Sequence, residues 1–211
     1  MVVLELGAKK VFASALDWPG WVRADRTDET ALDALAAYRD RYAEVAGEAG
    51  LALPADEPFE VTERLPGTRT TDFGAPDAMA TRERAALSDA DAERFARLVA
   101  ASWTVFDRVY ASSAPELAKG PRGGGRDRDK MAQHVVNAEF MYARKFGLVL
   151  RTPSIDDVAA IAEERAAVLQ ALRTATGPVD AVGKGWSPAY AARRIAWHVL
   201  DHAWEMQDKQ P

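Results

Sequence analysis

Residues 187–208 read Ser187-Pro-Ala-Tyr-Ala-Ala-Arg-Arg-Ile-Ala-Trp-His198-Val-Leu-Asp-His202-Ala-Trp-Glu-Met-Gln-Asp208. A serine followed by proline is typical of a helix start, because proline lacks the N–H group that would be unpaired in the first turn. Apolar residues then recur at helical spacing, on the face that also holds both histidines. This stretch therefore predicts a long helix whose buried face carries His198 and His202.

Three further segments show the same periodicity and are each about 20 residues long. The first begins at Ser88. The second extends from about Asp127 to Phe146, and the third from Pro153-Ser154 to Gly177-Pro178. A flexible basic loop, Gly120-Pro-Arg-Gly-Gly-Gly-Arg126, separates the first two. Four helices with one apolar stripe each predict an up-down four-helix bundle over residues 88–211.

The sequence of the first 66 residues predicts two strands, one helix and a third strand. Residues 9–16 and 21–25 are rich in strand formers and flank the turn Asp17-Trp-Pro-Gly20, which indicates a hairpin. Thr27 begins a helix that extends to about Ala49, and residues 58–65 alternate like a third strand. We predict a ββαβ module at 1–66, a linker at 67–87 and an α+β fold for the whole chain.

Composition excludes several classes of protein. The net charge is −5 and the pI is about 5.3, which argues against a nucleic-acid partner. Cysteine is absent, so any metal must be held by nitrogen and oxygen ligands. The chain shows neither a secretory signal nor a long apolar run, so we expect no membrane partner and a cytoplasmic location. Unpaired strand edges of the module make a homodimer possible.

The chain contains three histidines, and all three lie on faces that we predict to be buried. His198 and His202 are four residues apart and so point the same way, while His134 belongs to another helix. Three imidazoles can hold one divalent metal and leave coordination positions open. The alternative is that each is a core histidine bonded to backbone. An inverted zinc-protease motif is disfavoured, because Asp201 stands where such motifs have glutamate.

The predicted helices also indicate where other polar and aromatic residues lie. Arg194 faces the same side as His198, so its guanidinium could hold a substrate carboxylate; the alternative is an ion pair. Asp201 is expected in solvent or in an ion pair between helices, and Glu139 in solvent. We expect Tyr110 and Tyr142 to pack in the core, and Trp197 and Trp204 to pack in the core or against the N-terminal module.

Two of these helices resemble those of DinB-like bundle proteins, a superfamily that includes YfiT-like and mycothiol-dependent enzymes. Residues 131–147, which include Met131-Ala-Gln-His134 and Asn137-Ala-Glu139, resemble the second helix, and residues 193–208 resemble the fourth. The resemblance covers about residues 88–208. In that family one histidine of helix two and a His-x-x-x-His pair of helix four bind a divalent metal, usually zinc or nickel. The resemblance thus implies His134, His198 and His202 as metal ligands.

The same resemblance implies a reaction class. Characterised members are metal-dependent and often use low-molecular-weight thiols such as mycothiol or bacillithiol. We therefore expect a transferase or isomerase that acts on a small molecule with a thiol cosubstrate. A metal-dependent hydrolase is an alternative.

The N-terminal segment has a second resemblance. Phe12-Ala-Ser-Ala-Leu-Asp-Trp-Pro-Gly-Trp21, followed by Thr27-Asp-Glu-Thr-Ala-Leu32, is similar to the HicB-like ββαβ fold. HicB proteins are antitoxins, although the fold also occurs without toxin partners. The resemblance implies an interaction or lid element. It also leaves open a non-catalytic, antitoxin-type module in which the histidines are structural.

Overall fold

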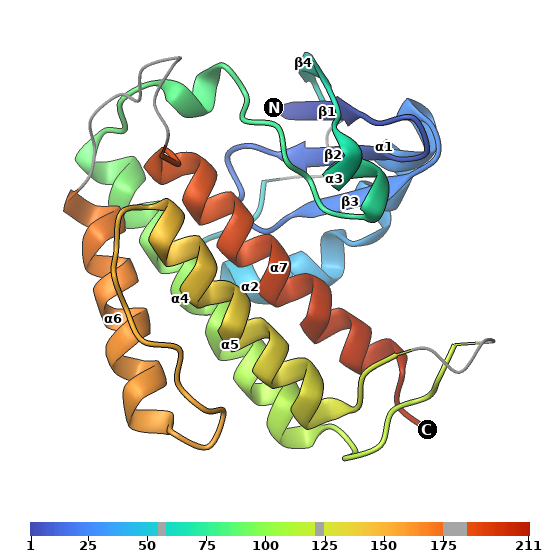
Figure 1. Cartoon of the computed structure of the whole chain (residues 1–211). Coiled ribbons are helices and arrows are strands. Elements are labelled where there is room, and N and C mark those ends of the chain that lie inside the picture. Colours follow the sequence, from blue (N-terminus) through green and yellow to red (C-terminus); the bar gives the residue numbers. More distant parts are fainter. Residues whose placement is uncertain (55–57, 121–124, 175–184) are drawn as a thin grey trace.

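The computed structural model describes residues 1–54, 58–120, 125–174 and 185–211. Within these ranges the chain is α+β, as predicted, with a mixed sheet near the N-terminus and helices over the rest (Figure 1). The predicted basic loop at 120–126 and the predicted helix end at Gly177-Pro178 lie mainly or wholly outside the described residues.

The sheet has four strands, in the order β3-β2-β1-β4. The strands are β1 (Val2–Leu6), β2 (Val11–Ala15), β3 (Val22–Asp25) and β4 (Val61–Pro66). β1 pairs antiparallel with β2 and parallel with β4, so it is a central strand. The predicted ββαβ module is therefore wrong in one respect, because it lacks β1.

The missed strand contains a buried carboxylate, which interrupts its apolar pattern. Glu5 is 2% exposed, and its carboxylate accepts hydrogen bonds from the Thr71 hydroxyl and from the backbone N–H groups of Asp77 and Ala78. Such bonds compensate the cost of burying the charge. The donors lie 66 to 73 residues away, so local periodicity does not reveal them.

The predicted helix at 27–49 is two helices, α1 (Asp28–Ala37) and α2 (Arg39–Glu48), which meet at Tyr38. Thr27 begins α1 with the expected capping box, shared with Thr30. α1 packs on β2 and β3, whereas α2 packs on α4 (Asp89–Ser112). The break lets the two halves contact different neighbours.

The predicted linker contains two short helical segments and is tied to the rest of the molecule. These are α3 (Arg69–Phe73) and a 3₁₀ turn at Arg82–Arg84. Glu83 in this turn forms a buried ion pair with Arg193, with nitrogen–oxygen distances of 2.5 and 2.8 Å. Residues 67–87 are thus a packed strap across the molecule.

The four predicted long helices are present as α4, α5 (Arg128–Lys145), α6 (Val158–Thr174) and α7 (Pro188–Asp208). Ser88 and Ser187 cap α4 and α7 as predicted, each accepting a hydrogen bond from a backbone N–H of the first turn. α6 begins at Val158, later than predicted, because residues 148–157 form an irregular connection. α4 contacts α6 and α7, and α5 contacts the same two helices.

The alternating up-down order is wrong, since α4 runs parallel to α7 and α5 parallel to α6 (Figure 1). Four contacts near the helix ends show which ends lie together. These contacts join Arg173 with Glu93, Tyr110 with Asp129, Gln210 with Ser113, and Ile155 with Gln133. Gln133 holds the backbone of Pro153 and Ile155 alongside α5. Ten extended residues span about 33 Å, more than the ~27 Å length of α5, so this connection can run back along the helix.

α7 lies between the sheet and the other helices. Trp197 packs edge-to-face on Phe12 of β2, and Trp204 packs on Tyr38, with ring centroids 6.1 and 5.1 Å apart. This confirms the predicted packing of both tryptophans against the N-terminal part. Gly20, with φ of +97°, brings the β2–β3 turn against Leu200. The N-terminal part thus supports α7 on both sides of His198.

Candidate metal centre

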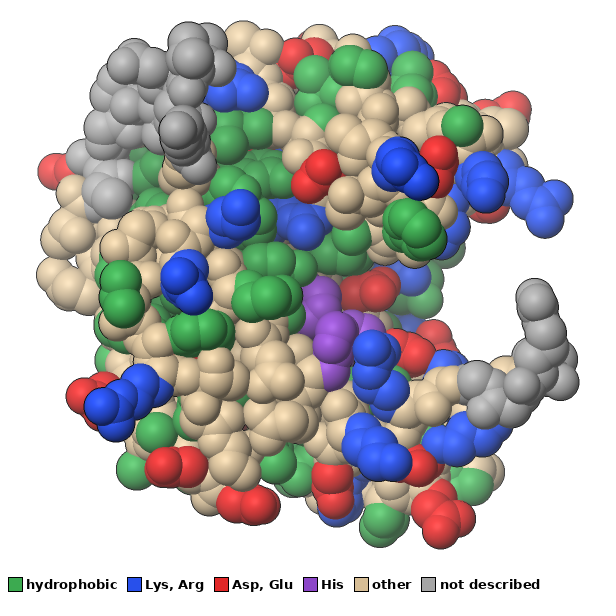
Figure 2. All heavy atoms as spheres, in the orientation of Figure 1, with side chains coloured by type: hydrophobic (Ala, Val, Ile, Leu, Met, Phe, Trp, Pro, Cys, Tyr) green, Lys and Arg blue, Asp and Glu red, His purple; other side chains and the backbone are tan. Residues whose placement is uncertain are grey.

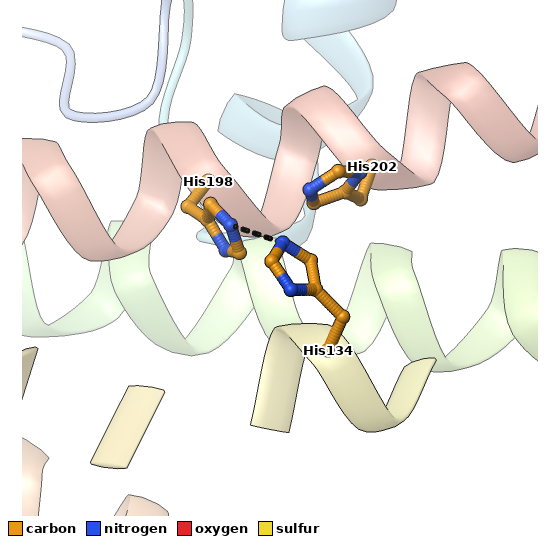
Figure 3. Close-up of side chains that lie close together, drawn as sticks. All are labelled: His134, His198 and His202. Atoms are coloured by element: carbon orange, nitrogen blue, oxygen red, sulfur yellow. Dashed lines mark hydrogen bonds between the residues drawn. The ribbon is translucent and has the colours of Figure 1, made fainter. Parts of the chain in front are cut away.

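The three histidines converge between α5 and α7 (Figure 3). His198 and His202 come from successive turns of α7, and His134 faces them from α5. One candidate ligand nitrogen from each lies within 4.8 Å of the others, and the Nε2 atoms of His134 and His198 are 3.3 Å apart. Among the described residues, no other group of three or more His, Cys, Asp or Glu side chains has metal-ligand geometry.

The spacing of the nitrogens fits one cation. Zinc binds imidazole nitrogen at about 2.0–2.1 Å, so two ligands of a tetrahedral site are about 3.3 Å apart. The pair His134 and His198 already has this separation. The candidate nitrogen of His202 lies within 4.8 Å of the other two, so all three imidazoles border one position.

The protonation of the cluster favours cation binding. Burial, followed by the proximity of His202 and His134, lowers the pKa of His198 well below its usual value of 6.5. Burial is also the main cause that lowers the pKa of His134 to about 4. Both imidazoles are therefore neutral at pH 7 and keep a lone pair for a metal.

Glu205 orients the third histidine. Its carboxylate lies 2.8 Å from Nδ1 of His202 and also accepts a hydrogen bond from Lys209. The hydrogen bond with His202 is the main cause that lowers the pKa of Glu205 to about 2. A proton on Nδ1 leaves Nε2 free as a ligand, the arrangement common around protein metals. Glu205 was not among the predicted site residues, although its place three residues after His202 is a usable signal.

Arg194 lies beside the cluster, on the predicted side of α7, and is 4% exposed. Its guanidinium lies over the rings of Tyr142, Trp186 and Trp197 at 5.0 to 5.6 Å. One nitrogen donates a 3.3 Å hydrogen bond to the Tyr142 hydroxyl. In the described part of the chain it forms no ion pair, so the ion-pair alternative has no partner there.

The remaining polar predictions have mixed outcomes. Asp201 forms an ion pair, but with Arg23 of strand β3 at 3.0 Å and not between helices as expected. Glu139, predicted to be exposed, is only 3% exposed and accepts a hydrogen bond from Trp103. That prediction is wrong because α6 covers this side of α5 and supplies Arg165 as a partner for Glu139. Tyr110 and Tyr142 pack against the core, as predicted, and stay half-buried.

The cluster is accessible from one face of the molecule. Figure 2 shows histidine side chains at the inner end of a recess, with acidic and basic side chains nearby. A cavity of about 310 Å³ adjoins the site, with Glu205 in its wall. Its lining residues are Arg23, Tyr38, Asp201, Trp204, Glu205, Asp208 and Lys209. None of the three histidines lines this cavity, but His134 and His202 are themselves partly exposed.

No family model, curated protein or solved structure matches this chain. The DinB-like and HicB-like resemblances therefore stay predictions that depend on the residues quoted for them. None of the described helices combines the length and the apolar character needed to cross a bilayer.

Proposed function

We propose that this chain is a metal-dependent enzyme of the DinB-like superfamily, a transferase or isomerase that uses a low-molecular-weight thiol of the mycothiol or bacillithiol type. The observation that supports this best is the three-imidazole cluster with a 3.3 Å Nε2–Nε2 separation. In this proposal α4 to α7 form the DinB-like bundle. The HicB-like part supports α7 and forms one side of the recess.

A divalent cation such as zinc or nickel, when held by these histidines, would keep positions open and lower the pKa of a thiol or water bound there. His134, His198 and His202 would hold it. Glu205 keeps His202 oriented, while Tyr142 and Trp197 shield His198 from water, their rings 5.6 and 5.9 Å from its ring. The chain has no cysteine, so the thiol must come from a cosubstrate.

The cell compartment and the assembly are part of the same proposal. A thiol cosubstrate stays reduced in the cytoplasm, and we place the protein there. The substrate is a small molecule, given the size of the cavity beside Glu205, about 310 Å³. β3 and β4 are the edge strands of the sheet and offer a surface for a homodimer.

Metal content provides the first test. Protein purified without a metal-affinity tag should carry close to one equivalent of zinc or nickel by elemental analysis. His198→Ala should lose it, whereas Gln207→Ala, an exposed change on the same helix, should keep it. Metal-free protein whose stability is unaffected by His198→Ala and His202→Ala would contradict the proposal and favour a non-catalytic interaction module.

A thiol screen provides the second test. Mycothiol, bacillithiol and glutathione are each combined with a panel of small electrophiles. We expect thiol-dependent turnover by the wild-type protein and by Gln207→Ala, but not by His198→Ala. Cleavage of esters or amides without any thiol would instead identify a metal-dependent hydrolase.

A further inference from the structure

Arg194 differs from the other arginines buried along the helices. Arg193 is paired with Glu83, and Arg165 is paired with Glu139 and Asp107. Arg194 is 4% exposed and has no such acid among the described residues. Its Nε and Nη1 atoms are buried without a hydrogen-bond partner. Three N–H donors therefore point into the protein unused.

This arrangement is costly to the folded protein. A buried cation without a counter-ion is destabilising by several kcal/mol, and the faces of aromatic rings recover only part of that. Tyr142, Trp186 and Trp197 supply such faces around Arg194. A guanidinium held in place by rings, with its donors free, is prepared for a planar anion.

The position of Arg194 links it to the histidine cluster. Arg194 and His198 are one turn apart on α7 and share two neighbours, Tyr142 and Trp197. Tyr142 and Trp186, which contact the guanidinium, are only half-buried. A ligand on Arg194 would lie next to a ligand on the histidines.

We propose that Arg194 binds the carboxylate of a small substrate whose reacting group lies at the histidine cluster. The second half of this statement rests on the proposed function, whereas carboxylate binding by Arg194 does not. The three aromatic rings would cover the apolar part of such a substrate. The carboxylate would supply the counter-ion that Arg194 lacks among the described residues.

Carboxylate binding can be measured on the full-length protein without knowledge of the substrate. Acetate, succinate and cyclohexanecarboxylate, with their methyl esters as neutral controls, are titrated at constant ionic strength. Tryptophan fluorescence reports binding, because Trp186 and Trp197 flank Arg194. The thermal midpoint gives a second readout. We expect saturable binding of at least one carboxylate and of no ester.

Three variants test the assignment. Arg194→Gln should weaken carboxylate binding at least tenfold and leave the metal content unchanged, and Arg194→Lys should be intermediate. Arg94→Gln is the matched control, since Arg94 lies over Trp18 at 4.4 Å and belongs to neither site. Arg194→Met should raise the thermal midpoint without ligand, because it removes a buried charge that no described residue pairs with. No binding of any carboxylate by the wild type, or unchanged binding in Arg194→Gln, would overturn the proposal.

Removal of metal separates this proposal from the proposed function. Protein treated with a chelator should still bind the carboxylate, with affinity within tenfold of the untreated protein. Carboxylate binding could instead be lost on metal removal and unchanged in Arg194→Gln. That result would mean that the carboxylate binds the cation, and it would overturn the role of Arg194. Protein that never holds metal but binds carboxylate through Arg194 would refute only the metal-dependent reaction.

Discussion

At the scale of single residues, the histidine cluster has a neighbour, Glu205, that is not one of the three candidate metal ligands. Glu205 fixes the His202 ring through a 2.8 Å hydrogen bond. Glu205→Gln keeps the shape of the side chain but removes the negative charge. We expect zinc affinity to fall about 10- to 100-fold, the usual effect of losing such a partner. Competition with a zinc-chelating dye measures it.

The control for this change is Asp208→Asn, since Asp208 lines the same cavity but pairs with Arg41. Its zinc affinity should match that of the wild type. Equal affinity in Glu205→Gln would show that His202 needs no carboxylate to act as a ligand.

A second residue-scale prediction concerns Glu164 on α6, which is 4% exposed and has no partner for either carboxylate oxygen in the described residues. Burial, and then the nearby Glu139, raise the pKa of Glu164 to about 7 from 4.5. The folded state therefore binds the proton more tightly than the unfolded state. The contribution of Glu164 to stability is most favourable below pH 4.5 and is lost as the pH rises through about 7.

Glu164→Gln removes this pH dependence. We expect the variant to gain about 3 kcal/mol over the wild type at pH 8 and little at pH 4.5, because one pKa unit corresponds to about 1.4 kcal/mol and the pKa of Glu164 rises from 4.5 to about 7. Urea unfolding at both pH values measures the difference. Glu163→Gln, an exposed neighbour, should change neither value. A constant difference between Glu164→Gln and wild type at all pH values would argue against a raised pKa.

At the scale of elements, the β2–β3 turn is fitted closely to α7. Gly20 adopts a φ of +97°, and a Cβ atom there would lie 2.7 Å from Leu200. Gly20→Ala combines backbone strain with a clash, so we expect a loss of about 1 to 3 kcal/mol in the free energy of unfolding. Gly47→Ala is the control, because Gly47 lies in α2 with open space around its Cα. There alanine should be neutral or slightly stabilising.

Urea unfolding compares the two glycine variants. Equal stability of Gly20→Ala and wild type would mean that the β2–β3 turn is not closely packed against α7. In that case the N-terminal part would not hold the helix that carries His198.

The elements that the sequence predicted well are those with local signals. Ser88 and Ser187 each begin a helix through a bond to a residue three positions away, and the His134 and His198 faces follow from helical spacing. The elements it missed depend on distant partners. β1 needs donors around Ala78 to bury Glu5, and the direction of α6 depends on how Gln133 holds Ile155. No periodicity within a segment contains that information.

The site shows the same division. Three metal-ligand candidates were predicted from spacing, and the structure brings them together. The burial of Glu139 was not predicted, because it arises from the covering helix α6 and its Arg165. Arg194 has no counter-ion in the described residues, and this too is a property of the folded arrangement, since acidic residues are common in the sequence.

At the scale of the whole molecule, one hydrophobic core joins the parts that the sequence suggested as separate domains. The same cluster of buried side chains includes Leu4 and Ala13 of the sheet and Leu98 and Val199 of the helices. The buried Arg193–Glu83 ion pair connects the strap to α7. The sheet and the helices bury their apolar faces against each other. The helices should therefore depend on residues 1–87 for stability.

A chain that begins at Ser88 tests this dependence. It would expose Trp197 and Trp204, which pack on Phe12 and Tyr38 in the full chain. It would also remove Glu83, Ser14 and Ala78, the hydrogen-bond partners of Arg193 in the full chain. We expect the truncated chain to lose its near-UV circular dichroism, to unfold without a sharp urea transition, and to bind zinc more weakly. A sharp transition together with full zinc affinity would show instead that α4 to α7 fold alone and that the N-terminal part serves another purpose.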